Sequence, residues 1–232
     1  MIMIIPVFDV KDNMCVSGKS GARNTYSKLD SVYGDDIREI ALNLKNNGFE
    51  FVYIADLDKI EGIFDNSELI CEIDSVVPVL LDNGASSMDD LEFNKNICSY
   101  PILSTETMTS IEETYKIFKN NPYDNIILSV DIVNNELLVK NKHIKMVDIV
   151  RLINEVKPSY TILLNISQVG TKKSDDNTLI NEVIQKTPYT QHIIGGGLTN
   201  KSIKEYRTEG INNFLVGTIL HEGNLSPELV KP

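Results

Sequence analysis

Two aspartates, Asp9 and Asp131, each end a short apolar run: Ile5-Pro-Val-Phe-Asp9 in one half of the chain and Leu128-Ser-Val-Asp131 in the other. Two carboxylates that face each other can form an acid/base pair, in which one group gives a proton and the other takes one. Such a pair works when its surroundings separate the two pKa values, and it needs neither a metal nor an organic cofactor. A carboxylate at a strand end can also merely cap the next loop, but the matched positions favour catalysis.

A second set of residues has the features of a phosphate site. The triple glycine Gly195 to Gly197 follows an apolar run and precedes a helix that we expect Asn200 to cap. Gly217 and Thr218 repeat this arrangement one predicted strand later. Glycines let backbone N–H groups approach an anion, and the positive end of the next helix adds to the attraction. Glycines can also serve simply as sharp turns, yet two such turns in succession favour phosphate.

The polar loop from Lys11 to Gly34 contains Ser17-Gly-Lys-Ser-Gly-Ala-Arg23, which invites comparison with a Walker A phosphate loop. The first glycine of that motif would fall at Asn13, and a polar run follows where the motif requires a helix, so we exclude it. We expect instead a mobile lid in which Lys19 or Arg23 closes over the substrate. An ordinary solvated loop is the alternative.

The composition excludes several classes of protein. The chain has 232 residues, 42% of them hydrophobic, and a formal net charge of -11. A strongly acidic chain lacks the basic surface that nucleic acid or an anionic membrane requires, and no apolar run is long enough to span a membrane. The histidines and cysteines are scattered along the chain, at His143, His192, His221, Cys15, Cys71 and Cys98. Their spacing predicts neither a metal site nor a disulfide framework, and we expect a reduced, cytoplasmic protein.

Short runs rich in Ile, Val and Leu alternate with amphipathic stretches along the chain, a pattern typical of βα units around a buried parallel sheet. The expected strands are Met3 to Asp9, Phe51 to Asp56, Val77 to Leu81, Tyr100 to Ser104, Asn125 to Asp131, Tyr160 to Asn165, Gln191 to Ile194 and Asn213 to Val216. The expected helices are Asp35 to Asn47, Asn66 to Asp74, Ser87 to Lys95, Ser110 to Lys119, Met146 to Val156, Asp175 to Lys186 and Lys201 to Glu209.

This alternation predicts an α/β protein, a single (β/α)8 TIM barrel that occupies residues 1–232 as one domain. The last helix should be weak or truncated, because Gly223 and Pro227 interrupt the residues after Thr218. The two halves of the chain also resemble each other. Leu81-Asp-Asn-Gly84 matches Ile194-Gly-Gly-Gly197, and Ser104-Thr105 matches Gly217-Thr218, with the same number of residues between the members of each pair. We therefore expect two similar half-barrels, with a small hairpin that turns at Asn134-Asn135 after Asp131.

These residues resemble a known family, the histidine-biosynthesis barrels (the HisA/HisF family) of the ribotide isomerase and the cyclase subunit of imidazole glycerol phosphate synthase. Ile4-Ile-Pro-Val-Phe-Asp-Val-Lys-Asp12 is similar to the opening of those proteins, and the resemblance implies that Asp9 and Asp131 are catalytic. Further family-like positions are Pro78 to Ser87, Gly170-Thr171, Gly195 to Gly197 and Val216-Gly-Thr218.

The chain departs from the family where the N-terminal half would bind a second phosphate. Asp82 and Glu106 stand where that family has small residues, and Leu164-Asn165 and Val169 replace its acidic and threonine positions after strand six. A carboxylate a few Å from a phosphate costs on the order of a few kcal/mol. We therefore expect a substrate with one phosphate, held by the C-terminal half, and another end that is neutral or cationic. Whether the two acids face the site stays open at this point.

The sequence thus predicts a HisA-like isomerase of a divergent branch, acting on a small phosphorylated, ribotide-type metabolite. Further candidates for substrate contact are Asn165, Gly170 and Thr171. One alternative is a lyase or cyclase of one-carbon cofactor biosynthesis, of the methanopterin or methanofuran type. The other is a barrel that binds a phosphate ligand without catalysis, because a fold alone does not confer function. A glutaminase-type partner and a homo-oligomer are both left open.

Overall fold

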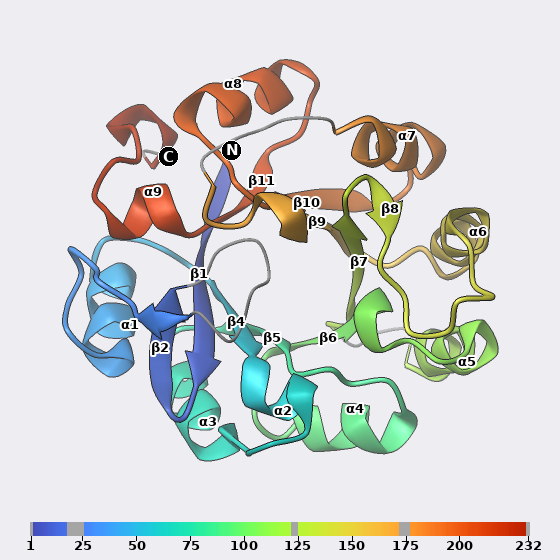
Figure 1. The fold of residues 1–232 in the computed structure, drawn as a ribbon, viewed down its shortest axis with the longest axis horizontal. Helices are drawn as coiled ribbons and strands as arrows, with labels where there is room; N and C mark the ends of the chain where they lie inside the picture. The colour runs from blue at the N-terminus through green and yellow to red at the C-terminus, as the bar shows by residue number, and fades with distance from the viewer. Residues whose placement is uncertain (1, 18–25, 122–124, 172–176, 231–232) are drawn as a thin grey trace.

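The structure is a computed structural model that describes residues 2–17, 26–121, 125–171 and 177–230. Its centre is a closed barrel of eight parallel strands, and helices surround the barrel (Figure 1). The first strand pairs with the last, from Met3 opposite Asn213 to Pro6 opposite Val216, which closes the ring. The barrel strands are β1 (Met3–Lys11), β4 (Val52–Asp56), β5 (Val79–Asp82), β6 (Tyr100–Ser104), β7 (Ile127–Val133), β9 (Tyr160–Asn165), β10 (Gln191–Gly195) and β11 (Asn213–Val216). The predicted (β/α)8 barrel is therefore confirmed.

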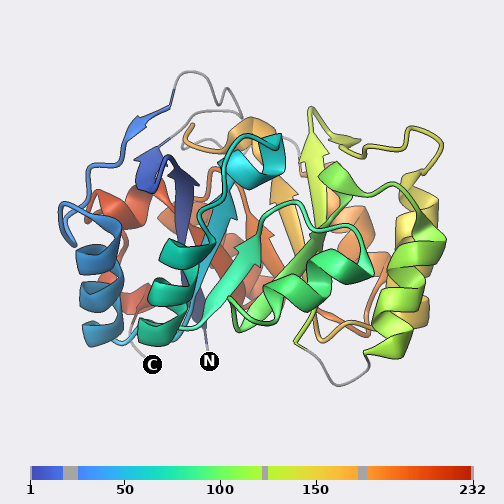
Figure 2. The same ribbon diagram turned by 90° about the horizontal axis from the view of Figure 1, so that it is seen from below.

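The long helices lie on the outside of the barrel, each after the strand that precedes it in the chain (Figure 2). They are α1 (Ile37–Asn46), α3 (Ser67–Val76), α4 (Met88–Asn94), α5 (Ile111–Asn120), α6 (Met146–Val156), α7 (Thr178–Lys186) and α8 (Asn200–Thr208). After β11 the chain forms only α9 (Thr218–His221) and the 3-10 turn η4 (Pro227–Leu229), so the last helix is short, as predicted.

Two local predictions need correction. The cap of α8 is Thr199, whose hydroxyl accepts a hydrogen bond from the N–H of Ser202. Asn200 is instead the first helical residue, and its side chain binds the backbone at Asn224 and Ser226. The sequence analysis also missed α2 (Leu57–Glu61), which Asp56 caps by accepting from the N–H of Lys59. A helix this short leaves almost no periodic signal.

Side chains alternate along each strand between the interior of the barrel and the layer under the helices. One buried side chain from each of the eight strands meets inside the barrel. These are Ile5, Tyr53, Leu80, Ile102, Ile127, Ile162, Ile193 and Leu215. Because the period is two, the next inward position toward the carboxyl end of each strand faces the mouth of the barrel. Asp82 and Gly217 lie at this position, two residues beyond Leu80 and Leu215. Asp9 and Asp131 lie one inward position further, four residues beyond Ile5 and Ile127.

The half-barrel repeat is visible in two equivalent hairpins that extend β1 and β7. In the first, β1 pairs with β2 (Met14–Ser17), and in the second, β7 pairs with β8 (Glu136–Leu137). Both turns use two residues with positive φ: Asp12 and Asn13 at 51° and 57°, and Asn134 and Asn135 at 52° and 60°. The hairpin at Asn134-Asn135 is therefore confirmed. The hairpin at Asp12-Asn13 falls in a stretch that we expected to be loop throughout.

Each hairpin is attached to the chain just beyond the neighbouring strand. The N–H of Asp12 donates to Oδ2 of Asp58 at 2.6 Å, and the N–H of Asn134 donates to Oγ of Ser167 at 2.6 Å. Asp58 and Ser167 are both the second residue after their strand ends. Equivalent contacts therefore hold the loops that follow Asp9 and Asp131, although the side chains that make them differ.

Candidate active site

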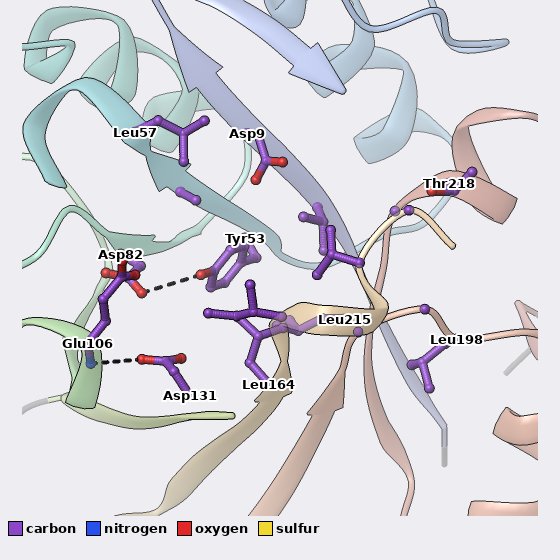
Figure 3. Close-up of a pocket in the computed structure, with 18 of the residues that line it drawn as sticks. Asp9, Tyr53, Leu57, Asp82, Glu106, Asp131, Leu164, Leu198, Leu215 and Thr218 are labelled. Carbon is purple, nitrogen blue, oxygen red and sulfur yellow. Dashed lines mark hydrogen bonds between the residues drawn. The ribbon is translucent and has the colours of Figure 1, made fainter. Parts of the chain in front are cut away.

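A pocket lies at the carboxyl ends of the barrel strands, where active sites of this fold are found (Figure 3). Several residues selected from the sequence line it together. They are Asp9, Asp82, Glu106, Asp131, Gly170, Gly196, Gly197, Gly217 and Thr218. Asn165, Thr171 and Gly195 are not part of this lining. The lid candidates Lys19 and Arg23 lie outside the described residues.

Asp131 is buried, with 1% of its surface exposed, and donors surround its carboxylate. Oδ2 accepts hydrogen bonds from the hydroxyl of Ser104 and from the N–H of Glu106, the latter at 3.1 Å. Oδ1 accepts from the hydroxyl of Ser129 at 2.9 Å. Burial raises the pKa of Asp131, whereas these hydrogen bonds oppose the rise. An aspartate with a raised pKa fits the proton donor of an acid/base pair.

Asp9 reaches the same pocket from β1 (Figure 3). It is only partly buried, and in β1 it lies opposite Val16 of the hairpin and Ala55 of β4. The strands of the two half-barrels thus bring the matched aspartates to one cavity from different sides. Asp131 is the more enclosed of the two, so their environments differ, as an acid/base pair requires.

The structure answers whether Asp82 and Glu106 face the site, because both line the pocket. Asp82 ends β5 on the inward face, and Glu106 lies in the 3-10 turn η2 (Thr105–Thr107) after β6. Figure 3 shows their side chains on one side of the pocket and Thr218 on the other. The pocket therefore has an acidic wall, formed by Asp82, Glu106 and Asp131, and a wall of glycine turns.

The three glycines after β10 serve different purposes. Gly196 and Gly197 have φ of 103° and 59°, a region that favours glycine, and both line the pocket. A Cβ at Gly196 would lie 2.2 Å from the carbonyl oxygen of Asn165, so no other residue fits there. Gly195 is absent from the lining, and a Cβ there would lie 2.8 Å from Cδ1 of Leu164. Packing alone explains that glycine.

The loop after β9, the sixth strand of the barrel, does not place all of its predicted substrate-contact residues in the pocket. Leu164 points into the pocket, and Asn165 therefore points away from it, because neighbouring residues in a strand face opposite sides. Asn165 is buried, and among the residues that the structure describes its Oδ1 has no hydrogen-bond partner. Thr171 donates from its hydroxyl to the carbonyl of Gln168 at 2.7 Å, which holds the turn. Gly170 does line the pocket.

The sequence analysis missed Tyr53, whose ring lies in the barrel interior and whose hydroxyl reaches the pocket. The signal was available, since period-two alternation in the strand places Tyr53 on the same face as Ala55. It also missed the apolar part of the lining, which includes Leu57, Ile60 and Leu215. Within the described parts of the chain, no three His, Cys, Asp or Glu residues are grouped to hold a metal ion.

The chain is a closed (β/α)8 barrel with a pocket at the carboxyl ends of its strands, the place where barrel enzymes have their active sites, and acidic and glycine-lined walls form this pocket. Residues 3–226 match the family described as histidine biosynthesis protein, and the chain belongs to that family. Among the described residues no helix is long and apolar enough to cross a membrane.

Three relatives illustrate the range of the family. An uncharacterized protein of Methanocaldococcus jannaschii is 34% identical over 230 residues, covering 97% of this chain and 96% of the relative. From the same organism, an isomerase of 1-(5-phosphoribosyl)-5-((5-phosphoribosylamino)methylideneamino)imidazole-4-carboxamide is 26% identical, covering 96% and 94%. The isomerase of the same name from Cenarchaeum symbiosum is 25% identical, covering 96% of each chain.

Proposed function

We propose that this protein is an isomerase that interconverts the aldose and ketose forms of a phosphorylated, ribotide-type metabolite by acid/base catalysis. The observation that carries the proposal is that Asp9 and Asp131 line one pocket together with Gly196, Gly197 and Gly217. A reaction of this class moves a proton between two neighbouring carbons and another to or from an oxygen. A pair of carboxyl groups in different environments suits both transfers.

In this mechanism the substrate phosphate binds the turns at Gly196 to Gly197 and Gly217 to Thr218, where backbone N–H groups supply donors. The sugar carbons then extend toward the two aspartates. Asp131, whose pKa burial raises, holds a proton and protonates the substrate oxygen. Asp9, which is more exposed, takes the proton from carbon. The names of the isomerase relatives support this class of reaction for a member of the family.

The test is an assay of purified protein with the imidazole-carboxamide substrate of the named relatives and with ribose 5-phosphate and ribulose 5-phosphate. We expect turnover of at least one of these compounds, and its loss in both Asp9→Asn and Asp131→Asn. Mass spectrometry of metabolites retained by gently purified protein identifies the ligand independently. The proposal is wrong if none is turned over and the retained ligand is not a sugar phosphate.

A barrel that binds a phosphorylated ligand without converting it is the second candidate. One observation favours it: Leu164, Ile166 and Val169 make the wall beside Gly170 apolar. A site of that kind binds the same ligands but leaves them unchanged, so the assay above separates the two functions.

The free thiols of Cys15, Cys71 and Cys98 support the expectation of a reducing compartment in either case.

A further inference from the structure

Tyr53 differs from every other member of the ring of side chains inside the barrel. Of the residues that the strands contribute to this ring, only Tyr53 carries a polar atom. Tyr53 is only 3% exposed. Its aromatic ring therefore belongs to the core of the barrel, and its hydroxyl reaches the pocket. A buried tyrosine hydroxyl needs a hydrogen-bond partner, and this need restricts where it can point.

The partner of Tyr53 in the structure is Asp82. The hydroxyl donates to Oδ2 of Asp82 at 3.4 Å, which is long for a bond between a hydroxyl and a carboxylate (Figure 3). A bond of that length is weak, so the hydroxyl can turn to a closer acceptor on a bound ligand at small cost. A carbonyl or enolate oxygen of a substrate is such an acceptor.

The hydroxyl also interacts electrostatically with the acidic groups of the site. Burial raises the pKa of Tyr53 well above its ordinary value, and Asp82, Asp131, Asp9 and Glu106 raise it further, in that order. Figure 3 shows the Tyr53 side chain between Asp9 and Asp131 in this view, with its hydroxyl directed toward Asp82. The raised pKa keeps the proton on the hydroxyl at neutral pH, so Tyr53 acts as a donor.

We propose that Tyr53 is a catalytic residue that donates a hydrogen bond to the carbon-2 oxygen of the substrate while the proton on carbon is being moved. The proposal rests on the proposed isomerase function and names a group that function did not include. When the base removes a proton from carbon 1 of the ketose, the C–H electron pair forms the C1–C2 double bond. The carbonyl π pair then moves to the carbon-2 oxygen. Tyr53 keeps its own proton and stabilises the negative charge that develops on that oxygen until Asp131 protonates it, as donors in an oxyanion hole do.

The variant Tyr53→Phe tests this assignment because it removes the hydroxyl and keeps the ring in the core. Tyr100→Phe is the matched control. Tyr100 also points into the barrel interior, where its ring packs edge-on against Phe51 at 5.5 Å, but it does not line the pocket. We expect kcat for the best substrate of the assay above to fall about a hundredfold in Tyr53→Phe, the typical effect of losing one such donor, with KM changed less than threefold. Tyr100→Phe should match the wild type.

A second measurement does not depend on turnover. The probe is 4-phospho-D-erythronohydroxamate, whose planar hydroxamate group imitates a five-carbon enediolate, with its carbonyl oxygen at the place of the carbon-2 oxygen. Calorimetric titration should show affinity for this probe about tenfold or more weaker in Tyr53→Phe than in wild type. Affinity for inorganic phosphate should be unchanged, because the phosphate binds the glycine turns. Thermal unfolding of each variant checks that the barrel is intact.

The outcomes separate the two proposals. If the wild type turns over a sugar phosphate and Tyr53→Phe has the same kcat and the same hydroxamate affinity, Tyr53 has no catalytic role and the isomerase proposal stands. A loss of stability with unchanged hydroxamate and phosphate affinities means that the hydroxyl only supports Asp82. If the wild type neither converts the substrates nor binds the hydroxamate, the isomerase proposal is wrong and the assignment of Tyr53 is wrong with it.

Discussion

The hydroxyl of Ser104 donates a hydrogen bond to Oδ2 of Asp131 and so connects the end of β6 to the aspartate of β7. This contact favours the charged carboxylate and opposes the effect of burial on the pKa of Asp131. Removing the hydroxyl in Ser104→Ala should therefore raise that pKa further. If Asp131 is the proton donor, the alkaline limb of the kcat/KM profile moves to higher pH by about one pH unit, since a hydrogen bond to a charged group is worth about 1.5–3 kcal/mol. Ser75→Ala, an exposed serine far from the pocket, is the control and should leave the profile where it is.

Asp9→Asn and Asp131→Asn should each reduce turnover about a hundredfold or more, the usual contribution of a general acid or base. Both variants keep the size of the side chain, so the affinity for inorganic phosphate should not change. Asp89→Asn on α4, outside the pocket, controls for the loss of one negative charge. Normal turnover in both site variants would refute the assignment.

Bulk introduced at the glycine turns should act differently at two positions. A Cβ at Gly217 has open space, with Cβ of Val7 the nearest atom at 3.8 Å, whereas a Cβ at Gly196 meets backbone at 2.2 Å. Gly217→Val should therefore lower phosphate affinity at least tenfold with a small change in the free energy of unfolding. Gly196→Ala should also destabilise the protein by at least about 1–3 kcal/mol, because alanine is strained at this φ and its Cβ must also displace the carbonyl of Asn165. Urea titration and phosphate calorimetry of the two variants decide the matter, and equal phosphate affinity in Gly217→Val and wild type would contradict the phosphate site.

The acidic wall predicts a ligand with one phosphate. Asp82 and Glu106 lie across the pocket from Thr218, where a second phosphate of an extended ligand would end (Figure 3). Repulsion between a phosphate and a carboxylate is on the order of a few kcal/mol at short range. We expect ribulose 5-phosphate to bind more tightly than ribulose 1,5-bisphosphate, and the double variant Asp82→Asn, Glu106→Gln to reduce that preference. Tighter binding of the bisphosphate to wild type would show that the second phosphate avoids these acids.

Stability should fall in mild acid because of buried histidines. Burial lowers the pKa of His192 to about 4, and it also lowers the pKa of His221, whose Nε2 donates to the carbonyl of Val7. An unfolded histidine has a pKa of about 6.5, so between about pH 6.5 and 4 the unfolded chain binds more protons than the folded one. The stability that the neutral histidines contribute is therefore complete above about pH 6.5 and is lost as the pH falls toward 4.

His192→Gln should flatten this acid dependence, measured as the urea midpoint against pH. His143→Gln is the control, since that side chain is exposed. The explanation fails if both variants lose stability in acid as steeply as the wild type.

The order and type of the main elements could be predicted from the sequence because each depends on local patterns. Apolar runs such as Tyr100–Ser104 and Tyr160–Asn165 coincide with strands in the structure, and Met146–Val156 coincides with a helix. Asp9 and Asp131 could be selected because each lies at the end of such a run and each matches the other in the repeat. The glycine turns could be selected because successive glycines indicate either a sharp turn or a close approach of the backbone to an anion.

What only the tertiary structure decided is which neighbouring residue faces the pocket. Adjacent residues in a strand point to opposite sides, so the choice between Leu164 and Asn165 depends on the register of β9 in the barrel, which no local pattern fixes. The same reason explains why Gly195 proved to be a packing position. Closure of the barrel brings β1, β4, β5 and β7 to one point, and the site exists only there, because its side chains come from strands that are far apart in the chain.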